Sequence, residues 1–131
     1  MAKKKIVLCD SNIIIDIING VGQINDILTN LDETVAISVI TEIEVIAGAL
    51  NKGMQQSIIK KLKQYNVVHI DEEISLVASR LIKDYRLSCG LDIPDAFIAA
   101  TSIVYRLPLL TNNIKDFKFI KGIELFHTST L

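Results

Sequence analysis

Short apolar runs alternate with longer helical patterns along nearly the whole chain of 131 residues. This alternation restricts the fold to the α/β class, because parallel strands that are buried on both faces must be joined through helices. We expect a three-layer α/β/α arrangement around one central, mostly parallel sheet of about five strands. The expected strands are residues 5–9, 34–38, 66–70, 107–111 and 122–126.

Helical patterns occupy the intervals between these runs. The clearest one covers residues 71–87, in which apolar side chains recur at the spacing of one helix face. These side chains are Ile74, Val77, Ala78, Leu81, Ile82 and Tyr85. The other expected helices run from Ser11 toward Leu31 with a break near Gly20, and over 41–50, 54–65 and 92–105.

The composition indicates one folded domain, residues 1–131, with a substantial core. Half of the residues are apolar and the mean hydropathy is +0.39. The net charge is −1, from 14 basic and 15 acidic residues, so any contact with a nucleic acid requires a local basic patch. The two candidates are Lys3–Lys5 and the group Lys60, Lys61 and Lys63. The favoured interpretation of both is an ordinary solvated surface.

The cysteines and the hydropathy pattern bear on the compartment. Cys9 and Cys89 form neither a disulfide framework nor a Cys/His zinc pattern, and Cys9 is expected to be a small buried side chain. Charged residues return at Asp10 and Asp16, so we expect no signal peptide. The apolar runs are too short to cross a bilayer. The expected location is the reducing cytoplasm.

Four acidic residues lie where an expected strand gives way to a loop or where a helix begins: Asp10, Glu44, Asp95 and Asp116. In a parallel sheet such positions can converge at the carboxyl edge of the strands, where ligands bind. Carboxylates gathered in this way repel one another unless a divalent cation neutralises them. The pattern therefore predicts a metal-dependent active site.

Each acid also has an ordinary structural explanation. Asp10 can cap the following helix, and Thr41 with Glu44 has the spacing of a capping box. Asp92 can cap the helix in whose first turn Asp95 is favoured by the macrodipole. The fourth acid can be a turn residue. The order of all four along the chain, rather than any single one, favours a shared site.

Four segments in a fixed order carry a family resemblance: VLCDSNIIID, ISVITEIEVIAGAL, IPDAFIAATSIVYRLPLLTNNIKDF and GIELF. Together they resemble the PIN-domain ribonucleases, most closely the VapC-type toxins of toxin–antitoxin pairs. The resemblance spans nearly the whole chain. It implies a single PIN-like domain.

The resemblance also implies which residues are functional. The implied catalytic residues, which are also the implied metal ligands, are Asp10, Glu44, Asp95 and Asp116. Glu42 competes with Glu44 but is not followed four residues later by a glycine. Asn113 is an alternative to Asp116 at the fourth position, acting through a water molecule. The implied supporting polar residues are Ser11, Asn12, Thr111 and Asn113.

The activity implied by the resemblance is that of an endoribonuclease, in which one or two Mg²⁺ or Mn²⁺ ions activate water for attack on an RNA phosphodiester. The implied partners are RNA, a small antitoxin protein and a second copy of the chain, without a membrane. The alternative function is a catalytically inert PIN-like module that binds RNA or protein. A phosphoryl-acceptor domain is disfavoured because Asn12 stands where a second aspartate is needed, and a dinucleotide-binding domain lacks its glycine-rich loop.

Overall fold

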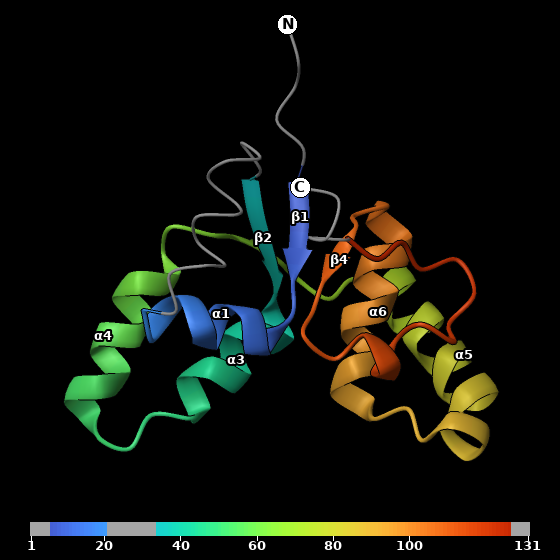
Figure 1. Cartoon of the computed structure of the whole chain (residues 1–131), viewed down its shortest axis with the longest axis horizontal. Coiled ribbons are helices and arrows are strands. Elements are labelled where there is room, and N and C mark those ends of the chain that lie inside the picture. Colours follow the sequence, from blue (N-terminus) through green and yellow to red (C-terminus); the bar gives the residue numbers. More distant parts are fainter. Residues whose placement is uncertain (1–5, 21–33, 127–131) are drawn as a thin grey trace, which may run out of the picture.

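Four parallel strands form the centre of the molecule, in the order β3-β2-β1-β4 (Figure 1). The computed structural model describes residues 6–20 and 34–126, so the helix expected between Gly20 and Leu31 lies outside the described residues. The strands are β1 (Ile6–Cys9), β2 (Thr34–Ser38), β3 (Asn66–Val68) and β4 (Leu109–Leu110).

The segment expected as a fifth strand is reduced to a single parallel bridge between Leu125 and Leu109. The amide of Leu109 donates to the carbonyl of Glu124, and the amide of Phe126 donates to the carbonyl of Leu109, both at 2.8 Å. Gly122 has a φ of 88°, a left-handed conformation that glycine adopts readily and that interrupts an extended chain. The sheet therefore has four strands, and all of its strand pairs are parallel.

Helices cover both faces of this sheet, which confirms the three-layer prediction (Figure 1). One face carries α1 (Ser11–Ile18), α3 (Val39–Ala47) and α4 (Lys52–Leu62). The other carries α5 (Glu72–Cys89) and α6 (Ile93–Tyr105). Among the described helices, none combines the length and the apolar character needed to span a membrane.

The start of α3 differs from the sequence expectation. The side chain of Ser38 accepts a hydrogen bond from the amide of Ile40 at 3.1 Å, so Ser38 is the N-cap. Thr41 is fully buried inside the helix, and the capping-box explanation of Thr41 and Glu44 is wrong. Because Glu44 does not serve that cap, its side chain is available for another role.

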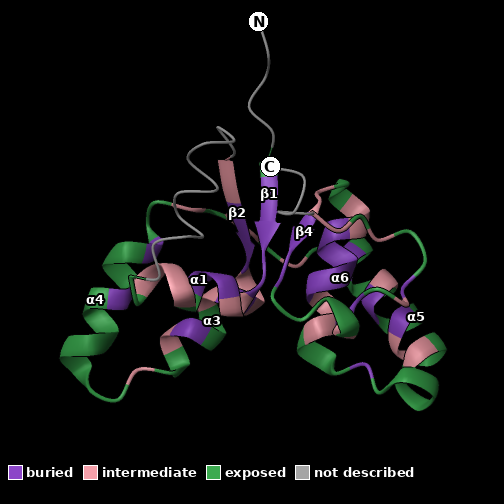
Figure 2. Ribbon diagram, viewed as in Figure 1, coloured by how far each residue is buried: buried purple, intermediate pink, exposed green. Residues whose placement is uncertain are grey.

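The central strands are largely buried, as Figure 2 shows for β1 and β4, whereas the edge strand β3 is exposed or half-buried. Alternate residues of a strand point to opposite faces, so Leu8 packs under α5 and α6 while Val7 and Cys9 pack under α1, α3 and α4. Burial raises the pKa of the Cys9 thiol to about 12, with a further contribution from the charge of Asp10. Cys9 is thus the small buried side chain that was expected.

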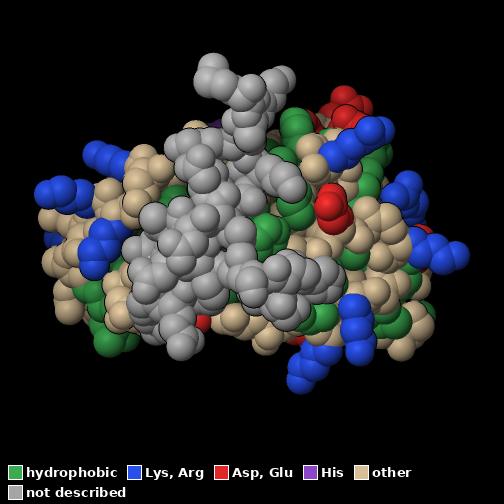
Figure 3. Space-filling model, turned by 45° about the horizontal axis from the view of Figure 1, so that its top comes forward, with side chains coloured by type: hydrophobic (Ala, Val, Ile, Leu, Met, Phe, Trp, Pro, Cys, Tyr) green, Lys and Arg blue, Asp and Glu red, His purple; other side chains and the backbone are tan. Residues whose placement is uncertain are grey.

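The basic residues do not gather in one place on the face shown in Figure 3, where the Lys and Arg side chains of the described residues stand apart at the flanks. Lys60, Lys61 and Lys63 are exposed at the end of α4, in agreement with a solvated helix face. Lys3–Lys5 lie outside the described residues.

The order of the strands reverses at β1. From β1 the chain adds β2 and then β3 on one side, whereas β4 lies on the other side. The amide of Asp10 donates to the carbonyl of Leu110 at 2.9 Å, which places the ends of β1 and β4 side by side. Ligands bind beyond such a switch point in open parallel sheets. Asp10 and Thr111, the first residues after these two strands, lie there.

Candidate active site at the carboxyl edge of the sheet

Asp10 is the buried carboxylate of the site, with 5% of its surface exposed. Its Oδ1 accepts from the amide of Ser11 at 2.8 Å. Its Oδ2 accepts from the hydroxyl of Thr111 at 2.8 Å and from the amide group of Asn12 at 3.3 Å. A carboxylate has about four acceptor positions, so three such bonds leave room for a further ligand. Asp10 is therefore both the N-cap of α1 and a candidate ligand.

Opposing effects act on the pKa of Asp10. Burial raises this pKa, and the negative charge of Asp116 raises it further. The hydrogen bonds from Thr111, Ser11 and Asn12 act in the opposite direction, because they favour the ionised carboxylate. The net result is a pKa above the ordinary value of an aspartate, and the three hydrogen bonds limit this rise.

Ser11 joins α1 to α3. Its hydroxyl donates to Oε1 of Glu44 at 2.8 Å and lies 3.2 Å from the hydroxyl oxygen of the buried Thr41. A hydroxyl has one proton, and a bond to a carboxylate is the stronger of the two. Glu44 is exposed, and among the described residues its Oε2 has no hydrogen-bond partner. One oxygen of Glu44 is thus fixed while the other faces solvent.

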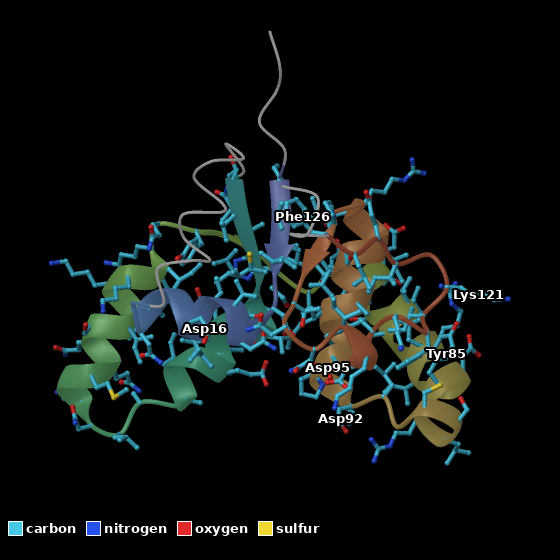
Figure 4. All side chains as sticks on the ribbon, in the orientation of Figure 1. Asp16, Tyr85, Asp92, Asp95, Lys121 and Phe126 are labelled. Carbon is cyan, nitrogen blue, oxygen red and sulfur yellow. The ribbon has the colours of Figure 1, made fainter. Side chains whose placement is uncertain are left out.

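Asp95 lies in the first turn of α6 and is half-buried. Its pKa is raised to about 7, first by burial and then by the negative charges of Asp10, Asp116, Asp92 and Glu44. Within residues 6–20 and 34–126, no hydrogen bond to its carboxylate is present that would oppose this shift. Figure 4 shows Asp95 beside Asp92 at the start of α6. The carboxylates predicted from the sequence therefore act on one another electrostatically.

The segment after β4 holds the remaining candidates. Thr111 is buried, donates to Asp10 and accepts from the amide of Asn113 at 3.0 Å. Asp116 closes a short 3-10 turn, η1 (Ile114–Asp116), and is half-buried. Its charge acts on both Asp10 and Asp95, which brings the fourth acid into the same group. The side chain of Asn113 is exposed.

Asn112 and Asp16 also hold this segment against α1, and the sequence pattern predicted neither of them as a site residue. The amide of Asn112 donates to Oδ1 of Asn12 at 3.2 Å, and its side chain donates to Asp16 at 3.0 Å. Asn12 and Asp16 lie one turn apart on the same helix face, and this spacing could have predicted that they share a contact. No such spacing marks Asn112, the residue that they contact. Thr41, which faces Ser11, was interpreted as a cap and not as a site residue.

The donor set suits a hard divalent cation. The candidate ligands are carboxylate oxygens, which Mg²⁺ and Mn²⁺ prefer, and several of them retain open acceptor positions. Burial and the neighbouring carboxylates raise the pKa of Asp95, and no positively charged side chain of the described residues is among the causes. In the described part of the chain, no three His, Cys, Asp or Glu side chains already have the spacing of a metal site.

Comparison with known proteins gives a consistent family. The PIN domain family matches residues 7–122. The chain is 34% identical over 95 residues to Ribonuclease VapC1 of Methanocaldococcus jannaschii, covering 70% of this chain and 69% of the relative. A toxin–antitoxin complex from Klebsiella pneumoniae contains a chain with 35% identity and a TM-score of 0.75, covering 89% of this chain and 94% of that one.

VapBC2 from Rickettsia felis, solved bound to a DNA fragment from their promoter, has 27% identity and a TM-score of 0.78. That match covers 92% of this chain and 97% of the other. The family predicted from the sequence is confirmed. The fold, the carboxylates at its switch point and these relatives all agree. The chain belongs to the PIN domain family and is a VapC-type ribonuclease of the kind found in toxin–antitoxin systems.

Proposed function

We propose that this VapC-type ribonuclease is a metal-dependent endonuclease that hydrolyses RNA phosphodiester bonds and uses Mg²⁺ or Mn²⁺. VapC-type PIN nucleases are generally metal-dependent. Asp10, Glu44 and Asp95 would hold the cation, with Asp116 at a fourth position. The observation that carries this proposal is that Asp10, Glu44, Asp95 and Asp116 converge at the carboxyl edge of the sheet, where burial and the neighbouring carboxylates raise the pKa of Asp95 to about 7. A divalent cation is the chemical species that relieves such repulsion.

The remaining polar residues would orient these ligands. When bound, the cation supplies positive charge that lowers the pKa of water and stabilises charge on the phosphate. Thr111 and the amide of Ser11 fix the orientation of the Asp10 carboxylate, and the Ser11 hydroxyl fixes Glu44. A bound cation would favour the ionised form of Asp95, and the proton that Asp95 partly retains near pH 7 would pass to solvent. Hydrogen bonds from outside the ligand set commonly tune a metal site in this way.

For the fourth position we favour Asp116, because its charge reaches both Asp10 and Asp95. Asn113 remains the alternative, acting through water, since its backbone is fixed by Thr111 while its side chain is exposed. An acid at this place adds to the negative charge that attracts the cation. An amide does not.

The proposed protein partner is a small antitoxin, and exposed apolar side chains near α3 and α4 support such a contact. Leu50 is 88% exposed, Ile43 57% and Met54 41%. In α1, by contrast, Ile13 and Ile14 are fully buried core residues. The same exposed residues could pair two copies of the chain, and we propose a homodimer that acts on cytoplasmic RNA.

An RNA-cleavage assay tests the proposed function. Purified protein should cut RNA with added Mg²⁺ or Mn²⁺, stop when EDTA is added and resume when the metal is restored. Asp10→Asn and Asp95→Asn should each lower the rate by at least roughly 100-fold. Asp84→Asn, an exposed acid of α5, is the matched control and should retain activity. Cleavage in EDTA, or full activity of either site variant, would refute the mechanism.

The toxin role has a separate test in cells. Expression of the chain alone should arrest growth, and co-expression of the neighbouring small gene should relieve the arrest. Mapping of RNA ends in arrested cells would identify the cleaved RNA. Arrest that persists in the Asp10→Asn variant would show that growth inhibition does not depend on cleavage.

A further inference from the structure

A cavity of about 600 Å³ begins at the site carboxylates Glu44 and Asp95 and continues to the end of α5. This volume falls in the range of small-molecule sites, roughly 300–1,000 Å³. Its walls include the apolar side chains of Ile82, Ile93 and Pro94. Ile93 is 65% exposed, so its apolar side chain is available for contact with a ligand. The cavity thus joins an apolar surface to the acidic centre.

Of the described residues that line this cavity, Arg86 alone is cationic. Its Nη1 lies 2.8 Å from Oδ1 of Asp92 and 3.3 Å and 3.4 Å from the carbonyl oxygens of Leu91 and Gly90. All three contacts use the same nitrogen. Within the described ranges, no acceptor faces Nε or Nη2 of Arg86. These two nitrogens form the fork that binds phosphate in a bidentate way.

Asp92 holds the guanidinium in place without closing the site. By position Asp92 is the N-cap of α6, but its side chain makes no capping hydrogen bond and pairs with Arg86 instead. The two side chains are 71% and 55% exposed, so water screens their attraction. A phosphate can therefore compete for Arg86. No cation is among the groups that shift the pKa of Asp95, so Arg86 does not neutralise the metal-binding end of the cavity.

We propose that this cavity binds the nucleotide of the RNA next to the scissile bond, and that Arg86 is a positioning residue that holds its phosphate. The inference rests on the proposed ribonuclease function, because the chain that is cut at the acids must pass along the adjoining surface. Ile93 and Pro94 supply apolar contact for the base or sugar, and Arg86 supplies the anion site. The combination of an anion site and an apolar wall favours a nucleotide over an acidic peptide.

Binding of a fluorescein-labelled single-stranded RNA, followed by fluorescence anisotropy over a salt series, tests this inference. The full chain is used in the Asp10→Asn background, which prevents cleavage and leaves the cavity lining intact. Arg86→Gln should raise Kd roughly tenfold, and lower the slope of log Kd against log salt by about 0.7, the value for one lost phosphate contact. Arg86→Lys should keep the slope and recover part of the affinity.

Two matched variants keep the test independent of folding. Arg80→Gln removes an exposed arginine of the same helix that does not line the cavity, and should change neither Kd nor the slope. Asp92→Asn removes a negative charge beside Arg86 and should tighten RNA binding roughly twofold to fivefold. A variant that binds more tightly cannot be explained by misfolding.

Two different results would contradict the inference. If Arg86→Gln lowers Tm but leaves Kd and the salt slope unchanged, Arg86 only stabilises the turn after α5 through its contacts with Gly90 and Leu91. If it weakens the antitoxin complex while RNA binding stays the same, the cavity belongs to the protein partner. Either result overturns the inference. Failure of the ribonuclease function would be seen separately, as a lack of metal-dependent cleavage by the wild-type chain.

Discussion

The two sides of the acidic site are built differently. On the sheet side, Asp10 is buried and its carboxylate accepts three hydrogen bonds, from Ser11, Asn12 and Thr111. On the side of α6, Asp95 is half-buried and has a pKa of about 7, because burial and four neighbouring carboxylates act on it. Hydrogen bonds from the protein oppose the rise in the pKa of Asp10, which stays above its ordinary value because of burial. Among the described residues, no hydrogen bond opposes the rise in the pKa of Asp95.

The two sides therefore contribute to the site in different ways. The β1–β4 pairing fixes Asp10 and Thr111 before any ligand arrives, so that side is preorganised. On the Asp95 side, neighbouring carboxylates repel one another, and the proposed cation would relieve this repulsion on binding. Glu44 stands between them, with one oxygen held by Ser11 and the other exposed. Variants on the two sides should therefore differ in what they change.

Of the three changes that follow, the largest effect is expected at Glu44, one of the proposed metal ligands. Glu44→Gln should lower the rate of RNA cleavage by roughly 100-fold, because a neutral amide is a poor ligand for a hard cation. Glu42→Gln is the matched control two residues earlier on the same helix, and should remain active. Steady-state cleavage kinetics of the two variants decide the question. Equal losses, or a greater loss for Glu42, would show that the wrong glutamate has been assigned.

A smaller effect is expected on the preorganised side. Thr111→Val keeps the shape of the side chain but removes the donor to Asp10, so activity should fall about tenfold and stability by about 1–3 kcal/mol. Thr111→Ser restores the hydroxyl and should recover most of both. Urea unfolding and cleavage rates measure the two effects. If Thr111→Ser is as impaired as Thr111→Val, the hydroxyl is not what matters.

The smallest effect concerns stability against pH in metal-free protein. The pKa of Asp95 is about 7 in the folded chain against an ordinary value of 3.8, so the folded state retains a proton that the unfolded state has lost. This contribution to stability is complete below pH 3.8 and disappears as pH rises through about 7. Asp95→Asn should lack it. Melting curves in EDTA should show the variant gaining in Tm over wild type as pH rises from 5 to about 8. A constant difference would contradict the raised pKa.

Much of the fold follows from the sequence pattern because the apolar periodicity is strong. The helix over 71–87 is observed as α5, with Ile74, Ala78 and Leu81 buried. The first and last residues of each helix and strand are harder to predict from this periodicity. Ser38 and Thr41 are both good caps, and which of them caps α3 depends on where β2 ends. Residues 122–126 have the composition of a strand, but pairing depends on the turn at Gly122 and on Leu109.

The site shows the same limit. The position of Asp10 at the end of β1 can be read from a single apolar run. The bond between Asp16 and Asn112 joins residues 96 positions apart, and no local pattern encodes it. Burial and hydrogen bonding cannot be ranked from sequence, so the sequence could not tell how Asp10, Glu44 and Asp95 differ. In the structure these acids differ in burial and in their hydrogen-bond partners.

The most direct measurement is the pKa of the Asp95 side chain by ¹³C NMR of the carboxyl carbon, with and without Mg²⁺. We predict a midpoint near 7 in EDTA and a fall to below about 4 when Mg²⁺ is added, since the bound cation favours the ionised form. Asp84 serves as an exposed reference whose signal should not respond to the metal. An ordinary pKa for Asp95 in EDTA, or a raised one that Mg²⁺ leaves unchanged, would contradict a cation site completed by Asp95.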